Sequence, residues 1–354
     1  MKGYQFEDTQ GTFHLKKAEN ISYLYFPIAG EAGLKSSLTP NLGGDAKIDQ
    51  NTFLLEPVSA ENLVNNRNSR NFWCNVKGIG SWSLTGNAAE ALSKKFTEMQ
   101  DDSEVTAGFM WQKTTRESKK YQLRGEILSF IPVEKNVEVM LVTITNTGRM
   151  AQTVTPTAAI PLYGRSADNI RDHRHVTSLL HRIETTDIGV LVTPTLSFDE
   201  RGHQVNHMTY YCVGWSGNGE KPVDFYPTAE DFVGEGGNFE RPYAIVKNAE
   251  GVKAGTRIEG LEAVGGLHFS EVTLEPEEEC SYLIFTGITE DIQEIRNLSK
   301  TYTTREMVLE ELEKTKAYWQ EKVNVAYHTG DSDFNQFMHW VSFQPILRRI
   351  YGCS

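Results

Sequence analysis

The chain has 354 residues, of which 39% are hydrophobic and 23% are charged, as expected of a folded globular protein and not of a disordered one. Its 47 acidic residues outnumber its 35 basic residues, and the net charge of −12 argues against nucleic acid or an anionic membrane surface as partner. The N-terminal run Met1–Asp8 lacks an apolar signal segment, and no apolar run reaches the ~18 residues of a transmembrane helix, so we expect a cytoplasmic protein.

Residues 1–288 are predicted to form a mainly β, antiparallel sandwich domain. Short runs of Val, Ile, Thr, Tyr and Phe alternate there with Gly, Asn, Asp and Pro, as in strands and turns. The clearest strand, 136–145, is apolar on both faces, which predicts burial between two layers. Near the end of the domain, the runs Glu271–Leu274 and Cys280–Phe285 flank an acidic turn and predict a hairpin.

Helical spacing replaces the β pattern in residues 289–328, which we expect to be linker helices. The first helix spans 291–299. Thr303 and Glu306 have the spacing of a capping box at the start of a second, longer helix. This helix is expected to bury one stripe of side chains, formed by Val308, Leu312, Thr315, Trp319 and Val323.

A third helix is predicted to begin at Asp331, as its N-cap, and to be kinked or ended by Pro345. The chain stops shortly after this helix, without a solvating tail, so residues 329–354 are expected to be the start of a helical domain that is cut short. The apolar face of the helix is predicted to comprise Phe334, Phe337, Met338 and Val341.

The densest polar cluster lies in residues 163–182, where four Arg and three His occur in an otherwise acidic chain. Forked Arg donors, together with Asn and His, suit multiple sugar hydroxyls or a phosphate. The alternative is a solvated loop in which Asp168 and Asp172 neutralise two of the Arg side chains.

Other patterns favour structural roles. His173 and His175, like His203 and His207, have the spacing of metal ligands but lack a third ligand, so we expect no metal site. The aromatic residues at 72–73, 82, 109–111 and 210–211 could offer a sugar platform, although aromatic residues in strands usually belong to the core. The four cysteines contain no C-x-x-C pair and are expected to be small buried hydrophobes.

Several segments together resemble glycoside hydrolase family 94, and within it most closely the 1,2-β-oligoglucan phosphorylases. Its relatives include cellobiose phosphorylase and the phosphorylase region of cyclic β-1,2-glucan synthases. The segments that carry this resemblance are Tyr23–Pro27, Glu31–Pro40, Gly43–Leu55, Arg70–Trp73, Gly164–Arg174 and Ser197–His203.

The resemblance implies a galactose-mutarotase-like super-sandwich, then linker helices leading to an (α/α)6 barrel. It implies an inverting phosphorylase, a glycosyltransferase-type enzyme of carbohydrate metabolism that converts β-1,2-linked glucose oligosaccharides and phosphate to α-glucose 1-phosphate. The family's general-acid Asp and phosphate-binding residues follow the position of Ser354, so this chain is expected to contain no catalytic residue and to be inactive alone. Inorganic phosphate is a co-substrate, and no cofactor is implied.

The resemblance also implies that family members are homodimers in which the sandwich reaches toward the barrel of the partner. The loop 165–175 is the candidate for this contact. A stand-alone carbohydrate-binding or scaffolding sandwich is an alternative, and a mutarotase-like enzyme would need a His and a carboxylate in one cleft. The residues expected to bind substrate are Arg165, Asn169, Arg171, Asp172, His173 and Arg174.

Overall fold

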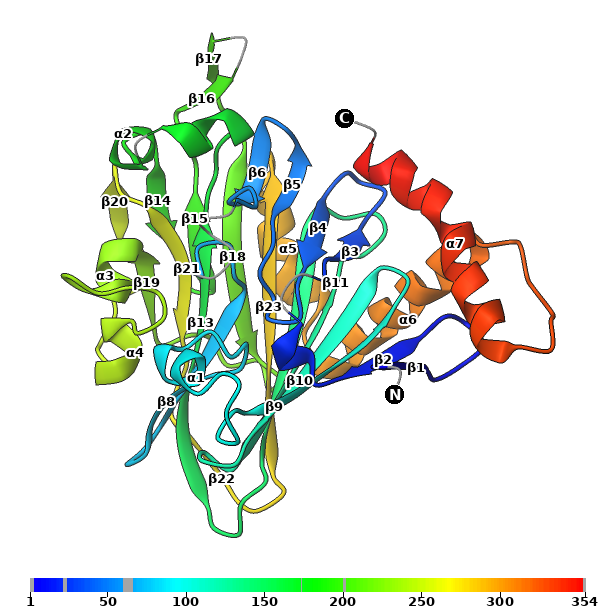
Figure 1. The fold of residues 1–354 in the computed structure, drawn as a ribbon. Helices are drawn as coiled ribbons and strands as arrows, with labels where there is room; N and C mark the ends of the chain where they lie inside the picture. The colour runs from blue at the N-terminus through cyan, green and yellow to red at the C-terminus, as the bar shows by residue number, and fades with distance from the viewer. Residues whose placement is uncertain (1–2, 22–23, 60–65, 173, 200–201, 353–354) are drawn as a thin grey trace.

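The computed structural model describes residues 3–21, 24–59, 66–172, 174–199 and 202–352. Its centre is a pair of antiparallel sheets packed face to face (Figure 1). The larger sheet contains, in spatial order, β1 (Tyr4–Phe6), β2 (Phe13–Lys16), β9 (Asp102–Gly108), β10 (Trp111–Ser118), β11 (Leu123–Phe130), β12 (Val137–Asn146), β23 (Glu279–Thr289), β18 (Thr209–Ser216), β15 (Gly189–Val192), β14 (Arg182–Thr185) and β20 (Arg257–Glu259).

The second sheet and two smaller ones complete the β structure. The second sheet contains β19 (Asp224–Thr228), β21 (Ala263–His268), β13 (Gln152–Leu162), β7 (Asn71–Val76) and β8 (Gly80–Ser83), with β22 (Val272–Leu274) also paired to β13. A four-stranded sheet contains β3 (Phe26–Ala29), β4 (Lys35–Leu38), β5 (Ala46–Asp49) and β6 (Thr52–Leu55), and a separate hairpin pairs β16 (Leu196–Asp199) with β17 (Gly202–Val205).

The helices are mostly short until the chain leaves the last strand. The α-helices are α1 (Ala89–Ser93), α2 (Arg174–Ser178), α3 (Ala229–Val233), α4 (Tyr243–Lys247), α5 (Ile292–Thr301), α6 (Arg305–Glu321) and α7 (Ser332–Tyr351), and the 3-10 helices are η1 (Ala18–Asn20) and η2 (Ala167–Arg171). No helix in the described part of the chain is both long and apolar enough to cross a membrane.

The inner faces of the two large sheets form the main hydrophobic core. Strand β12 lies between β11 and β23, and its side chains are buried on both faces, which confirms the prediction for residues 136–145. Nearly all the aromatic side chains predicted to be core are buried, Trp111 being half-buried. Cys74 and Cys212 are buried and Cys280 is half-buried, all with free thiols.

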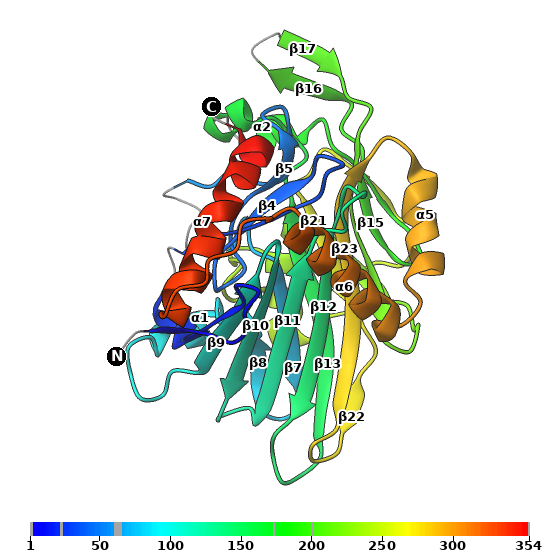
Figure 2. The same cartoon turned by 90° about the vertical axis from the view of Figure 1, so that its right-hand side faces the viewer.

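Helices cover the outer faces of both sheets, which explains why their strands are apolar on two sides. Side chains of α5 and α6 pack on the outer face of the larger sheet, and those of α3 and α4 on that of the second sheet (Figures 1 and 2). In α6 the predicted stripe from Val308 to Trp319 is buried, as is Val323 just beyond the helix. The division of the chain into domains at residues 288 and 328 stays a prediction.

The predicted hairpin of residues 271–285 is wrong. Strand β22 pairs with β13 in the second sheet, whereas β23 pairs with β12 and β18 in the larger sheet. The acidic turn therefore carries the chain from one sheet to the other. A turn between two apolar runs does not distinguish a hairpin from a crossing between sheets, because the strands with which β22 and β23 pair lie far away in the sequence.

The start of α6 also differs from its prediction. The N-cap is Thr304, not Thr303, and its side chain makes no capping hydrogen bond. The hydroxyl of Thr303 instead lies 3.2 Å from the sulfur of Met307. The cap predicted for the third helix is confirmed, since the carboxylate of Asp331 accepts from the amide of Phe334. Asp291, at the start of the predicted first helix, caps α5 by accepting from the amide of Gln293.

Helix α7 continues through Pro345, and its packed face is not the predicted one. Pro345 is exposed, so the carbonyl group that it leaves without a helical donor can be hydrated. Phe334, Phe337 and Val341 are exposed. Phe343 is fully buried and stacks on Phe109, with ring centroids 4.3 Å apart. The opposite side of the helix therefore meets the sandwich, because the turn between β9 and β10 provides a partner for it.

A buried ion pair fastens the four-stranded sheet to the main core. Arg70 and Glu138 are both fully buried, and the Nε of Arg70 lies 2.5 Å from Oε1 of Glu138. Arg70 also donates from Nη1 to the carbonyl oxygen of Gly44 at 2.8 Å, and the hydroxyl of Ser36 donates to Glu138 at 2.6 Å. Strands β4 and β12, the turn before β5 and the residue that precedes β7 are thereby linked by one polar network.

Candidate functional site

The Arg- and His-rich segment lies at one end of the sandwich, between the tip of β13 and the start of β14. Backbone hydrogen bonds fix its first part to the β5–β6 hairpin. The amide of Tyr163 donates to the carbonyl oxygen of Leu54 at 2.8 Å, and the amide of Phe53 donates to that of Arg165 at 3.0 Å. The amide of Ala167 donates to the carbonyl oxygen of Gln50 at 2.8 Å. The start of this segment is therefore an ordered extension of the four-stranded sheet, and not a solvated loop.

Two of the predicted site residues are buried within this segment. Arg165 and Asn169 are 6% and 5% exposed. The Nδ2 of Asn169 donates to the carboxylate of the exposed Asp172 at 2.8 Å. The hydroxyl of Ser166 lies within hydrogen-bond reach of the side-chain oxygen of Asn169 and of the carbonyl oxygen of Phe198 in β16. Asn169 thus serves the local structure, and substrate binding by these residues stays a prediction.

The other three predicted residues lie wholly or partly outside the described part of the chain. His173 is outside it, as are the side chains of Arg171 and Arg174. The backbone of Arg171 belongs to η2 and that of Arg174 to α2, at the same end of the sandwich, near the protruding β16–β17 hairpin (Figure 1).

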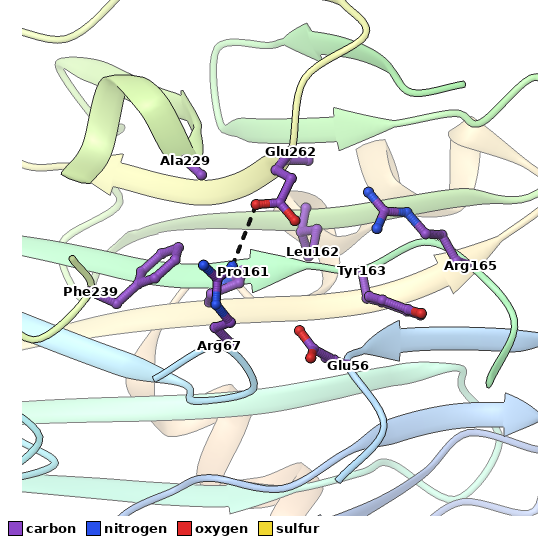
Figure 3. Close-up of a pocket in the computed structure, with 10 residues that line it drawn as sticks. Glu56, Arg67, Pro161, Leu162, Tyr163, Arg165, Ala229, Phe239 and Glu262 are labelled. Carbon is purple, nitrogen blue, oxygen red and sulfur yellow. Dashed lines mark hydrogen bonds and ion pairs between the residues drawn. The ribbon is translucent and has the colours of Figure 1, made fainter. Parts of the chain in front are cut away.

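Arg165 contributes to a charged pocket that local sequence patterns do not indicate. Figure 3 shows Arg165 and Arg67 on different sides of the pocket, with Glu262 and Glu56 near them. The Nη1 of Arg67 lies 3.5 Å from Oε2 of Glu262. The guanidinium of Arg165 lies over the ring of Tyr163 at 5.1 Å. The full lining is Glu56, Arg67, Pro161, Leu162, Tyr163, Arg165, Ala229, Phe239, Glu262 and Ala263.

The size of this pocket limits what it can bind. Its free volume is about 20 Å³. A cavity of that size holds about one water molecule, whereas ligand pockets usually measure ~300 Å³ or more. The two Arg and two Glu side chains balance in charge. We therefore interpret the cluster as an internal brace between β13, the β6–β7 connection and the segment before β21, and not as a sugar subsite.

Sequence reasoning missed Glu56, Arg67 and Glu262 because nothing local distinguishes them. They lie in connections between strands of three different sheets, and Arg67 and Glu262 are 195 residues apart. Isolated acidic and basic residues are common on surfaces, so only the path of the chain brings these together.

His181 is the ionisable group of this end whose environment differs most from water. It is fully buried, and its Nδ1 lies 3.2 Å from the carbonyl oxygen of Leu261. Burial, and then the positive charge of Arg165, lower the pKa of His181 to about 3. The imidazole is therefore neutral in the folded protein at physiological pH.

This burial predicts acid-sensitive folding. In the unfolded chain His181 has a pKa of about 6.5. Below that pH the imidazole is protonated in the unfolded state, whereas it stays neutral in the folded state down to about pH 3. We expect the free energy of unfolding to fall with decreasing pH, by up to about 1.4 kcal/mol per pH unit from this group, between pH 6.5 and pH 3.

Urea unfolding at several pH values measures this slope, and His181→Asn should make it shallower. Asn keeps a polar group near Leu261 but cannot bind the proton. His203 is exposed in β17, so His203→Asn is the matched control and should leave the slope unchanged. Equal slopes for wild type and His181→Asn would contradict the prediction.

The metal question concerns two histidine pairs. His173 and the side chain of His175 lie outside the described residues. His203 packs edge-on against Phe198, with ring centroids 4.3 Å apart. Among the side chains that the structure describes, no three or more of His, Cys, Asp and Glu are grouped to hold a metal ion.

A family model described as "Glycosyl hydrolase 94, supersandwich domain" matches residues 57–305. Among solved structures, the chain is similar to "Putative kojibiose phosphorylase from human microbiome", with a TM-score of 0.50 and 9% identity over 96% of this chain and 42% of that one. It thus spans less than half of that protein.

Two further structures are more distant. A bacterial glucoamylase complexed with acarbose gives a TM-score of 0.43 and 9% identity over 96% of this chain and 40% of that one. A "Putative aldose 1-epimerase" from Escherichia coli K12 gives a TM-score of 0.39 and 9% identity over 75% of this chain and 99% of that one. No curated protein matches the sequence. These likenesses concern the fold, whereas the family model covers well over half of the sequence. The chain therefore belongs to glycosyl hydrolase family 94, of which it carries the supersandwich domain.

Proposed function

We propose that this chain is the sandwich portion of an inverting phosphorylase that acts on β-1,2-linked glucose oligosaccharides. The observation that carries the proposal is the family match over residues 57–305. The choice of substrate rests on the resemblance of Gly43–Leu55 and Gly164–Arg174 to the 1,2-β-oligoglucan phosphorylases.

In the proposed reaction an oxygen of inorganic phosphate attacks the anomeric carbon from the face opposite the glycosidic oxygen. The bond between this carbon and the glycosidic oxygen breaks, and one carboxylic acid donates a proton to the leaving sugar. The product is α-glucose 1-phosphate. Phosphate is itself the nucleophile, so no protein general base is required.

The role we assign to the sandwich is to support and position the end that carries η2, α2 and the β16–β17 hairpin. Two features support this role. The start of the segment is hydrogen-bonded to the β5–β6 hairpin. The side chains of the charged pocket, which include Arg165, pack where the segment leaves β13. We propose that the segment contacts sugar, or the second subunit of a homodimer, through side chains beyond Asn169.

The assay is release of glucose 1-phosphate from β-1,2-glucooligosaccharides and phosphate. A polypeptide that joins this sandwich to an (α/α)6 barrel should release it in a phosphate-dependent manner, and phosphate-independent release of glucose would contradict the proposal. We expect no release from the 354-residue chain alone, because the resemblance to the family places the general acid and the phosphate-binding residues after the position of Ser354. Turnover by this chain would show that the catalytic groups had been misplaced.

A second candidate function is carbohydrate binding without catalysis. The observation that favours it is the protruding hairpin, whose β17 strand is exposed along its whole length, with Val205 65% exposed. Titration calorimetry with β-1,2-glucan fragments separates the two functions. Binding by the isolated chain that Arg171→Ala abolishes would favour this candidate, whereas absence of binding would favour a supporting role.

A mutarotase-like activity gains no support from the His–carboxylate pair that the structure contains. The Nδ1 of His268 in β21 lies 2.6 Å from the carboxylate of Asp224 in β19. Both residues are buried, and the ring of Tyr226 lies 5.6 Å from that of His268. The pair is packed under the outer layer of the second sheet, and not placed in a cleft that admits a sugar.

A further inference from the structure

A polar pocket lies between helix α5 and the connection from β11 to β12, beside the outer face of the larger sheet (Figure 2). Its free volume is about 300 Å³, the size at which ligand pockets begin. Among the described residues it shares no lining residue with the charged pocket around Arg165, with η2 and α2, or with the β16–β17 hairpin. Its polar lining includes Lys135, Asn136, Tyr211, Glu294, Asn297 and Thr301.

Tyr211 is the most buried polar side chain of this lining. It lies in β18 and is 3% exposed, and its ring packs in the same cluster as Ile295 and Leu298 of α5. Gly287 of β23 is paired with it across the sheet, and a Cβ added at Gly287 would clash with the Tyr211 hydroxyl. The absence of a side chain at Gly287 therefore makes room for this hydroxyl at the edge of the pocket.

The hydroxyl of Tyr211 is available to a ligand. It makes no hydrogen bond with the part of the chain that the structure describes, although a buried tyrosine hydroxyl usually has a partner. Burial, and then the negative charge of Glu294, raise the pKa of Tyr211 far above its ordinary value. The hydroxyl therefore keeps its proton at physiological pH and can donate to a molecule in the pocket.

One face of α5 supplies acceptors to the pocket. Glu294, Asn297 and Thr301 are three and four residues apart, which places them on the same face of the helix. One carboxylate oxygen of Glu294 accepts from the hydroxyl of Thr289 at 2.6 Å, and the other has no donor among the described residues. The side-chain amide of Asn297 is likewise unpaired there, and it offers both a donor and an acceptor.

The connection from β11 to β12 supplies an oriented donor. The side-chain oxygen of Asn136 accepts from the backbone amide of Leu34 at 2.9 Å, so its amino group is the part that is left to donate. The ammonium group of the adjacent Lys135 donates to the hydroxyl of Tyr302 at 3.0 Å and also lies over that ring. Lys135 is thus already engaged, whereas the half-buried Asn136 presents a donor that its own chain does not use.

These groups suit neutral hydroxyls better than they suit an ion. Tyr211 and Asn136 donate and the carboxylate of Glu294 accepts, whereas each sugar hydroxyl can do both. Glu134 also lines the pocket, so two carboxylates outnumber the ammonium of Lys135 and disfavour a phosphate or carboxylate ligand. The donors and the ammonium in turn disfavour a cation. A neutral molecule with several hydroxyls leaves no charge unpaired.

We propose that this pocket binds one neutral sugar ring, whose hydroxyls bond to Tyr211, Asn136 and Glu294. Val137 and Leu298 also line the pocket and supply apolar surface for the C–H groups of the ring. The site is distinct from the η2–α2 segment, to which we assign substrate contact, and it does not depend on the proposed phosphorolysis.

Saturation-transfer difference NMR of the 354-residue chain with glucose tests the site. We expect saturable binding with a Kd of about 1 to 10 mM, which a ligand of this size with a few hydrogen bonds attains. Tyr211→Phe removes only the hydroxyl and should weaken binding about 3- to 10-fold. Tyr210→Phe is the matched control and should leave the Kd unchanged, because Tyr210 packs in the main core and does not line the pocket.

A tryptophan on α5 tests the location without changing a buried group. Asn297→Trp places a large ring at the pocket from an exposed position of the helix and should abolish glucose binding. Arg296→Trp makes the same change at the adjacent exposed position, which does not line the pocket, and should leave binding unchanged. Circular dichroism checks that each variant remains folded.

Absence of saturable glucose binding would overturn the proposal, and so would equal binding by wild type and Asn297→Trp. Displacement of glucose by inorganic phosphate would overturn it as well, because the pocket would then be an anion site built on Lys135. Glucose binding that Arg171→Ala abolishes and Tyr211→Phe leaves intact would assign the sugar to the η2–α2 segment instead. Binding here needs no barrel, so failure of a sandwich–barrel polypeptide to release glucose 1-phosphate would leave this result standing.

Discussion

Glu138→Gln is expected to lower the free energy of unfolding by about 3 to 5 kcal/mol. The carboxylate of Glu138 is fully buried and accepts from Nε of Arg70 at 2.5 Å and from Nη2 at 3.0 Å. Gln has the same shape but no charge, so the variant leaves the guanidinium of Arg70 buried without a counter-ion. Uncompensated burial of a charge costs far more than the loss of a neutral hydrogen bond.

Urea unfolding followed by circular dichroism measures this loss, and a double variant identifies its cause. Arg70→Met with Glu138→Met removes both charges while retaining much of the buried volume. We expect it to recover most of the stability that Glu138→Gln loses, because replacing a whole buried ion pair by apolar groups is often close to neutral. A double variant no more stable than Glu138→Gln would mean that the hydrogen bonds to Gly44 and Ser36, and not the charge, are decisive.

Gly44→Ala is expected to lower the free energy of unfolding by about 2 to 6 kcal/mol. Gly44 has a φ of +121°, a conformation that side chains rarely adopt, and an added Cβ would lie 1.9 Å from the carbonyl oxygen of Ser37. That oxygen belongs to β4, so the clash is relieved only if the backbone shifts. Such a shift also displaces the carbonyl oxygen of Gly44 that Arg70 contacts.

The adjacent Gly43 provides a matched control for this substitution. Its φ is outside the left-handed region, and an added Cβ would lie 3.3 Å from the hydroxyl of Thr39. Gly43→Ala should change the free energy of unfolding by less than about 1 kcal/mol. Thermal unfolding of both variants tests the contrast, and similar melting temperatures would show that the turn rearranges without strain.

The two substitutions are not independent, because Gly44 and Glu138 share Arg70 as a partner. Residues of one hydrogen-bond network generally show coupling energies when they are mutated together. We therefore expect the combined variant to lose less than the sum of the two separate losses. Both residues lie outside the η2–α2 segment, so these changes act on the framework of the sandwich.

Patterns of short range were sufficient for much of the fold. The double-sided apolar run of β12 predicted a strand between two layers, helical spacing predicted α5, α6 and α7, and Asp331 was correctly predicted as the N-cap of α7. These features depend on residues within about two helical turns or one strand of each other. Their physical causes are the periodicity of buried side chains and the capping of helix ends by side chains, and both depend on residues close together in the sequence.

The sequence could not specify contacts that depend on where distant segments lie. It did not indicate that β22 and β23 belong to different sheets, or that Arg67 and Glu262 meet across 195 residues. It predicted an apolar face for the last helix that includes Phe337, but not that Phe343 packs on Phe109 while Phe337 remains exposed.

The sequence by itself determined a mainly β chain of family 94 character that ends in amphipathic helices. The tertiary structure decided which of the polar residues that look alike in sequence are internal. Arg165 and Asn169 were predicted to face a substrate, yet both are buried. The physical reason is that desolvation of a side chain depends on the segments packed over it, and at this end the four-stranded sheet and the β16–β17 hairpin supply them.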